Sequence, residues 1–159
     1  MDATLRAIRI GATRIPAIHA PERPGSAEFE SRLNISVVFT SAEVTQTALR
    51  MASALAGKLQ ARITLIVPEV VSYQLPLHQP PVVHDWNVKR FQALAAESPV
   101  ETSVRFYLCR DRDETLAREL KPHSLVVVGG KKRWWPTAES RLASRLRKLG
   151  HEVILAETE

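Results

Sequence analysis

Apolar residues along the chain form short runs, interrupted only by Ser36, Arg62 and Thr64, and longer segments with helical spacing separate these runs. The runs lie at residues 35–39, 61–67, 125–128 and 153–155. Runs of this length, rich in β-branched residues, are typical of strands buried on both faces of a parallel sheet. Residues 100–109 alternate apolar and polar side chains instead. This alternation predicts a strand with one less buried face, as at the edge of a sheet.

The segments between these strands are predicted to be helices. Thr40 with Glu43 fits a capping box, and the residues up to Leu59 carry apolar side chains at steps of three and four. Three further helices are predicted from apolar stripes of the same kind, over residues 83–97, 111–121 and 138–149. Strands that alternate with helices predict an α/β fold, with a doubly wound five-stranded parallel sheet covered by helices on both faces.

The strand order 3-2-1-4-5 is expected for such a doubly wound sheet. Ligands bind to these folds at the carboxyl ends of the strands, where the strand order reverses. In this order the reversal lies between the first and the fourth strand. We therefore expect Thr40 and Ser41, after the first strand, to lie beside Gly129 and Gly130, after the fourth.

The chain of 159 residues is long enough for one domain. Residues 1–33 contain prolines but little core-forming pattern, and we interpret them as an N-terminal arm that precedes an α/β domain over residues 34–159. Pro68 is expected to end the second strand. A loop of about a dozen residues follows it, and loops of this length are often functional or disordered.

The positive charge of the chain is local. The net charge is +5, yet residues 131–148 alone contain seven cations and one anion. Such a cluster favours a phosphate-bearing or acidic partner. No apolar run is long enough to span a membrane, so no membrane partner is expected. A single cysteine, Cys109, and a start without an apolar signal region predict a cytoplasmic protein.

The stretch Gly129–Arg133 is the candidate ligand site. Two glycines after a buried strand would allow a sharp turn whose amides hold an anion at the start of the next helix, and three cations follow them. The alternative is an ordinary tight turn with a solvated basic loop. Trp134 and Trp135 come next, and they would either stack on a base or, more commonly, cover a core edge or an interface.

No enzyme motif accompanies this stretch. The sequence shows no paired acid and base at convincing spacing, no Gly-x-Ser-x-Gly elbow and no Cys/His dyad. His78 and His84 have no nearby cysteine or carboxylate cluster, so no metal site is expected. We therefore expect no catalytic residue and no enzymatic activity.

The segments 35–41, 52–67, 113–116 and 124–129 together resemble the universal stress proteins. The resemblance covers about residues 34–156 and leaves the N-terminal arm without a counterpart. It implies a Rossmann-like regulatory protein of the stress response that binds ATP. ATP-binding members carry an aspartate at the end of the first strand, where this chain has Phe39-Thr40-Ser41.

The glycine motif of the family is also altered. Counted from Gly129 or Gly130, the second glycine position holds Lys132 or Arg133, and the third position holds no glycine either. The resemblance carries over the two glycines and one hydroxyl, from Ser140 or Ser144. The candidate ligand-binding residues are therefore Thr40, Ser41, Gly129, Gly130, Lys131, Lys132, Arg133, Ser140 and Ser144.

Two functions follow from this degenerate motif. The local charge favours a regulatory protein that weakly binds a nucleotide or another phosphate ligand, without a strong preference for ATP. The missing aspartate favours a ligand-free module for dimerisation or protein interaction that has lost ATP binding. Nucleic acid is a less favoured partner, because the basic residues form one compact cluster without a recognised motif. A homodimer is expected, since the last strand leaves an edge that needs cover.

Overall fold

The computed structural model describes residues 33–74 and 83–158. Most of the predicted N-terminal arm and the loop that contains His78 lie outside these residues. The strands are β1 (Asn34–Val38), β2 (Arg62–Val70), β3 (Thr102–Cys109), β4 (Leu125–Lys131) and β5 (Glu152–Thr158). The helices are α2 (Ala42–Leu59), α3 (Val83–Ala96), α4 (Arg112–Glu119) and α5 (Ala138–Lys148). No helix in the described ranges is long and apolar enough to cross a bilayer.

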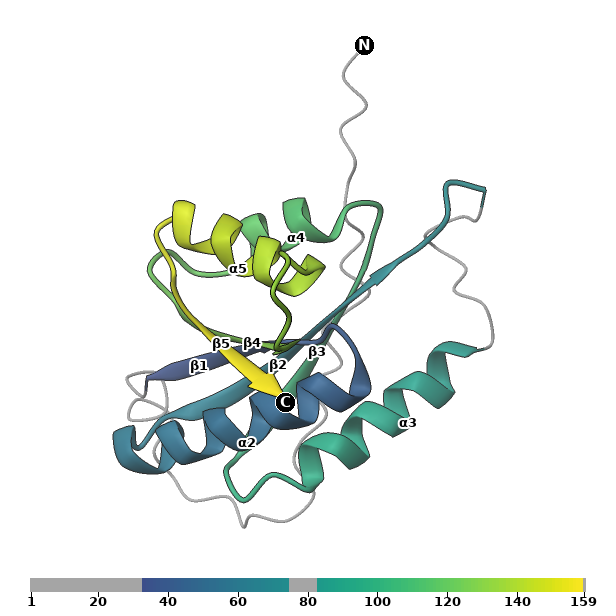
Figure 1. Ribbon diagram of the computed structural model, residues 1–159. Coiled ribbons are helices and arrows are strands. Elements are labelled where there is room, and N and C mark those ends of the chain that lie inside the picture. The colour runs from purple at the N-terminus through teal and green to yellow at the C-terminus, as the bar shows by residue number, and fades with distance from the viewer. Residues whose placement is uncertain (1–32, 75–82, 159) are drawn as a thin grey trace.

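The five strands form one parallel sheet in the order β3-β2-β1-β4-β5, which confirms the predicted fold and strand order. Helices α2 and α3 cover one face of the sheet, and α4 and α5 cover the other (Figure 1). Both faces are therefore buried, which explains why the central strands are continuous apolar runs rather than alternating ones.

Each face of the sheet has its own core. Val37 and Leu65 point toward α2 and α3, where they pack with Ala48, Ala52 and other small residues of α2. On the opposite face, Val38 and Ile66 pack with leucines of α4 and α5 (Leu116, Leu120, Leu142, Leu146). The small side chains of α2 bring this long helix close to the sheet, and that closeness shapes the candidate site.

The edge strands agree with the sequence pattern. β3 lies at one edge, and its first residues alternate between half-buried and exposed, as predicted from the alternation of residues 100–109. β5 lies at the other edge and extends from Glu152 to Thr158, well beyond the predicted run of three apolar residues.

The prediction that Pro68 ends the second strand is wrong. β2 continues through Pro68 to Val70, and Pro68 pairs with Tyr107 of β3. Along β2, the backbone N–H groups of odd-numbered residues donate to carbonyl oxygens on the β3 side, as seen for Ile63 in the strand and for Val71 just after it. The missing N–H of Pro68 therefore points toward β1, which has already ended at Val38. A proline at this position removes no sheet hydrogen bond.

The predicted capping box at Thr40 and Glu43 is also wrong. Helix α2 begins one residue later, with Ser41 as an N-cap that makes no side-chain capping hydrogen bond. The Thr40 hydroxyl instead donates to the carbonyl oxygen of Gly129, at 3.4 Å. The Glu43 carboxylate lies 2.9 Å from the Lys131 ammonium. Both side chains therefore contact β4 instead of capping α2.

Candidate functional site

The carboxyl edge of the sheet has a notch at its centre. β1 ends at Val38, paired with Ile66 of β2 and Val128 of β4. Both neighbouring strands continue beyond that level, β2 to Val70 and β4 to Lys131. The chain turns from β1 directly into α2, so the N-terminus of α2 lies at the base of the notch. This is the point where the strand order reverses, the usual ligand position in open α/β sheets.

Thr40 lies at the base of this notch, beside β4, as the strand order predicts. Its hydroxyl donates to the carbonyl oxygen of Gly129, and its N–H donates to the Thr45 hydroxyl at 3.2 Å. Ser41 is exposed at the start of α2. The polar groups of Thr40 are therefore occupied by the protein itself, whereas Ser41 remains open to solvent.

Gly129 and Gly130 do not form the predicted turn. Both lie within β4 and are buried, and they pair with Ala156 and Glu157 of β5. Just before β4, the carbonyl oxygen of Ser124 accepts the N–H of Glu152, and just after it the N–H of Lys132 donates to the carbonyl oxygen of Thr158. The backbone groups of even-numbered residues in β4 therefore face β5. The amide of Gly130 therefore serves the sheet. The expected amide cradle for a phosphate is wrong at Gly130, whereas the odd-numbered Gly129 and Lys131 direct their N–H groups to the β1 side of β4.

Packing explains why position 129 is glycine. A Cβ atom there would lie 2.0 Å from the carbonyl oxygen of Val44, in the first turn of α2. At Gly130 a Cβ atom would meet the side chain of Leu155 at 3.2 Å and the Cβ of Glu139 at 3.4 Å. The two glycines thus bring helices close to the strand, which is a structural reason rather than a ligand-binding one.

The three cations after β4 differ in their surroundings. The Lys131 ammonium is paired with Glu43, although both side chains are at least half exposed. Lys132 and Arg133 are exposed and form no ion pair within the described part of the chain. The Arg133 guanidinium lies over the ring of Trp135, 5.7 Å from its centroid. Lys132 and Arg133 are therefore the cations open to an anion.

The serines of α5 are poorly placed for a ligand. Ser140 donates its N–H to the Thr137 hydroxyl at 3.1 Å and its own hydroxyl to the Thr137 carbonyl at 2.9 Å. These bonds form the N-cap of α5. Ser144 is exposed one turn further along the helix. Glu139, in the first turn of α5, adds a negatively charged residue whose Cβ lies 3.4 Å from the position of a Cβ atom on Gly130.

The two tryptophans are exposed. Trp134 is 93% exposed and Trp135 is 54% exposed, so neither covers a core edge of the described domain. The core-edge part of the preferred interpretation is wrong, and the interface part stays a prediction. Their ring centroids are 6.1 Å apart and the rings are tilted by 55°. Residues Lys131 to Trp135 line an open hollow of about 490 Å³. We call this feature the tip hollow.

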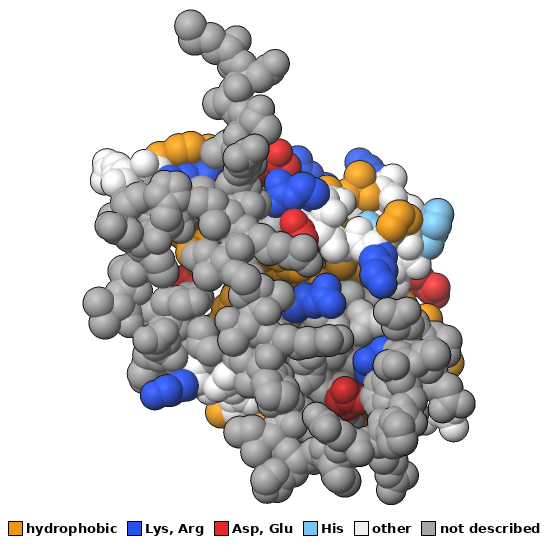
Figure 2. All heavy atoms as spheres, turned by 180° about the vertical axis from the view of Figure 1, so that it is seen from behind, with side chains coloured by type: hydrophobic (Ala, Val, Ile, Leu, Met, Phe, Trp, Pro, Cys, Tyr) orange, Lys and Arg blue, Asp and Glu red, His pale blue; other side chains and the backbone are white. Residues whose placement is uncertain are grey.

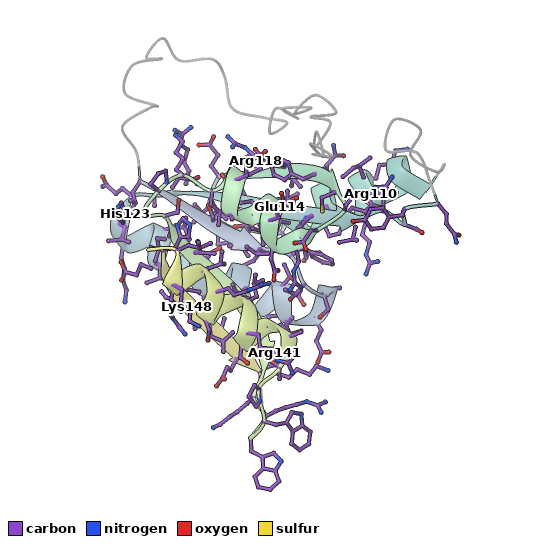
Figure 3. The ribbon with its side chains drawn as sticks, turned by 90° about the horizontal axis from the view of Figure 1, so that it is seen from above. Arg110, Glu114, Arg118, His123, Arg141 and Lys148 are labelled. Atoms are coloured by element: carbon purple, nitrogen blue, oxygen red, sulfur yellow. The ribbon has the colours of Figure 1, made fainter. Side chains whose placement is uncertain are left out.

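The loop that carries the tip hollow projects from the body of the domain. Figure 3 shows this projection beyond the end of α5 marked by Arg141, while Lys148 marks the other end of the helix. Seen from behind, the described Lys and Arg side chains are scattered among acidic and apolar ones (Figure 2). The cations after β4 are instead consecutive and lie beside indoles.

Among the described residues, three titratable groups away from the site have shifted pKa values. Burial raises the pKa of the Cys109 thiol, which makes it a poor nucleophile. Burial would raise the pKa of Asp113, but hydrogen bonds from Arg145 and Arg112 outweigh it and hold that pKa below its usual range. Burial, followed by the nearby His123, lowers the pKa of His151. These groups lie outside the notch and the tip hollow.

The described residues contain no group of three metal-ligating side chains. The His84 side chain, like His78, lies outside the described part of the structure. Sequence reasoning missed Glu43, Glu139 and Thr137, which neutralise or cap the elements around the site. Glu43 and Glu139 were visible as acids in the first turns of predicted helices. The contact of Glu43 with Lys131 depends on how α2 packs on β4, and the closeness of Glu139 to Gly130 depends on how α5 packs on β4.

Comparison with known proteins shows the fold. No family model and no curated protein matches the chain. A universal stress protein from Burkholderia pseudomallei is 23% identical, with a TM-score of 0.53 over 77% of this chain and 93% of that one. A universal stress protein from Archaeoglobus fulgidus is 14% identical, with a TM-score of 0.54 over 80% and 97% of the two chains.

A further structure, of the universal stress protein from Archaeoglobus fulgidus in complex with dAMP, is 9% identical, with a TM-score of 0.52 over 78% of this chain and 96% of that one. The chain therefore has the fold of the universal stress proteins, and it spans nearly the whole length of these three structures.

Proposed function

We propose that this chain is a non-catalytic regulatory protein like the universal stress proteins, which acts in the cytoplasm and weakly binds a nucleotide or another phosphate ligand after β4. The observation that carries the proposal is the exposure of Lys132 and Arg133, without carboxylate partners in the described chain, beside the point where the strand order reverses. Two open cations raise the local potential for a phosphate.

The fold supports a nucleotide as the ligand, since one structure of similar fold holds dAMP. The site itself supports weak binding. No aspartate follows β1, and the amide of Gly130 is used within the sheet. The attraction therefore depends on exposed charges, which are screened within about 10 Å at 0.1 M salt. Selectivity for ATP needs fixed donors and acceptors around the adenosine, and the described notch offers few.

Titrations test this proposal. ATP, ADP, AMP and inorganic polyphosphate are titrated at low and high salt against the protein and against Lys131→Ala/Lys132→Ala/Arg133→Ala. The matched control is Lys58→Ala/Lys121→Ala/Lys148→Ala, which removes three exposed cations outside this loop, with Lys148 at the opposite end of α5 (Figure 3). We expect weak, salt-sensitive binding that the first variant loses and the control keeps. Binding that is micromolar, insensitive to salt and selective for ATP would show an intact family site and contradict the proposal.

A second function is favoured by the position of β5 at the edge of the sheet. This strand is seven residues long, and no other strand of the described residues pairs with its outer side. A long unpaired edge is a template for a further strand. We propose that two copies pair there, and that the chain is a dimerisation or protein-interaction module if no anion binds. Sedimentation of the full chain at micromolar concentration tests the homodimer, and a pure monomer would exclude it.

A further inference from the structure

The loop of the tip hollow is held at both of its ends. On one side, the Lys132 N–H donates to the carbonyl oxygen of Thr158 at 3.0 Å, which extends the pairing of β4 with β5. On the other side, Thr137 caps α5, and the Arg141 guanidinium donates to the carbonyl oxygen of Pro136 at 3.4 Å. Hydrogen bonds therefore hold the backbone on both sides of residues 133–135.

The hollow combines cations with open aromatic surface. Its lining consists of three cations and two indoles, and it lies open to solvent on the surface of the loop. Because the indoles are tilted by 55° with their centroids 6.1 Å apart, they form an open wedge rather than a closed stack. Trp134, at 93% exposure, has ring surface available to a ligand.

We propose that the tip hollow binds aromatic phosphates, such as nucleoside phosphates, by stacking their ring on Trp134 or Trp135 while Lys132 and Arg133 hold the phosphate. The inference deepens the proposed function and rests on it. It moves the recognition of the base from the notch to the projecting loop.

The position of Arg133 supports this pairing of roles. Its guanidinium lies 5.7 Å from the centroid of the Trp135 ring. A nucleotide whose phosphate binds Arg133 can therefore place its base against this indole. Guanidinium groups suit phosphate recognition because their planar fork can donate two parallel hydrogen bonds. One mononucleotide can therefore meet a cation and an indole at once.

The same lining predicts little discrimination between bases. Lysine, arginine and tryptophan side chains donate hydrogen bonds but accept none. The donor groups on the edge of a base thus find no side-chain acceptor among the residues that line the hollow. Stacking on aromatic side chains tolerates every base, because each has a π-face. We expect a requirement for a ring without a preference for one base.

A comparison of AMP, GMP and ribose 5-phosphate tests the proposal with the full chain. These ligands share a phosphate monoester but only the first two have a base. Stacking contributes on the order of 5- to 100-fold in affinity, so we expect AMP and GMP to bind at least fivefold more tightly than ribose 5-phosphate and similarly to each other. Quenching of tryptophan fluorescence and chemical shifts of the indole N–H groups report where the ring binds.

The variants separate stacking from charge. We expect Trp134→Ala/Trp135→Ala to reduce the affinity for AMP to that for ribose 5-phosphate without changing the latter. Trp134→Phe/Trp135→Phe should keep most of the difference, since a ring remains. Tyr73→Ala is the matched control, because Tyr73 is also exposed and has the Arg110 guanidinium 5.0 Å from its ring centroid. This control should bind all three ligands like the unaltered protein.

The alternative outcomes are distinct. Equal binding of ribose 5-phosphate and AMP, unchanged by the tryptophan variants, would overturn this inference and leave the proposed function standing. No binding of any of these ligands or of polyphosphate would overturn both. If Trp134→Ala/Trp135→Ala instead changes the oligomeric state while the three ligands bind alike, the indoles serve an interface between copies, and the inference fails.

Discussion

The carbonyl oxygen of Val44 lies 2.0 Å from the position that a Cβ atom on Gly129 would occupy. The first turn of α2 therefore packs directly on the backbone of β4. This contact sets the geometry of the sheet edge, because it brings Thr40 within hydrogen-bonding distance of Gly129 and Glu43 within reach of Lys131. A glycine that the sequence assigns to ligand binding thus acts in the packing of a helix on a strand.

Gly129→Ala is expected to destabilise the domain by about 1–3 kcal/mol or more, as overpacking of a dense core does. The added methyl group would meet backbone atoms of α2, which cannot move aside as a flexible side chain can. Urea unfolding measures the change. Gly57→Ala is the matched control, since a Cβ atom there meets nothing within 4 Å, and it should stabilise the domain by roughly 0.5–1 kcal/mol. Equal stability of the two variants would contradict this packing.

The fold could be predicted from the sequence because its signals are strong and local. Continuous apolar runs identified the central strands, and helical spacing identified the helices between them. The prediction that Pro68 ends the second strand failed because the outcome depends on a neighbouring strand that is distant in sequence. Whether a proline interrupts a strand depends on which neighbour its missing N–H would face, and β1 ends before that point.

Removal of the Glu43 charge is expected to strengthen anion binding. Glu43 pairs with Lys131 at 2.9 Å, and Glu43→Gln would release that ammonium and remove a negative charge near the notch. Exposed ion pairs are worth about 0–1 kcal/mol, so the affinity for AMP should rise by up to about fivefold at low salt. Isothermal titration measures the effect.

Glu119→Gln serves as the control for this change, because Glu119 pairs with Arg118 on α4, away from the β4 loop. It should leave the affinity unaltered. An increase of the same size in both variants would mean that net charge, and not the Glu43–Lys131 pair, governs binding.

The three described helix N-caps are expected to differ in their contribution to stability. Asp111 accepts from the Glu114 N–H at 2.9 Å, and Thr137 accepts from the Ser140 N–H at 3.1 Å. Replacing either by alanine should cost about 1 kcal/mol of unfolding free energy. Ser41 makes no capping hydrogen bond, so Ser41→Ala should cost only a few tenths. A loss at Ser41 as large as at Asp111 in urea unfolding would show a cap that the structure lacks.

The candidate site could be predicted only in outline. The strand order and the cluster of cations placed Thr40, Gly129 and the basic segment at the same sheet edge. The roles of the glycines depended on how closely α2 packs, which follows from its small side chains in combination with β4. The exposure of Trp134 could not be read from the sequence, because indoles are found both in cores and on surfaces.

Deletion of residues 1–30 is expected to leave the α/β domain folded. The described residues from 33 onward contain the core clusters on both faces of the sheet and all five of its described strands. Circular dichroism and cooperative urea unfolding of the truncated chain measure this. An insoluble product, or one that unfolds without cooperativity, would place the N-terminal arm in the core or in an interface.

A decrease in stability is expected as the pH falls below about 6.5, owing to His151. Its side chain is buried, and its Nδ1 accepts the Ser124 N–H at 3.2 Å, which requires the neutral ring. Burial, and then the neighbouring His123, lower its pKa below the usual value of about 6.5 for a histidine. The unfolded chain therefore takes up a proton first. The stabilising contribution is complete above pH 6.5 and is lost as the pH falls through the lower pKa of the folded state.

Urea unfolding between pH 7.5 and 5.5 measures this loss, in a range above the ordinary titration of carboxylates. His151→Asn is the informative variant, because the asparagine Oδ1 can accept the same hydrogen bond but cannot take up a proton. We expect this variant to have a flatter pH profile, whatever its absolute stability. An equally steep profile in the variant would assign the effect to groups other than His151.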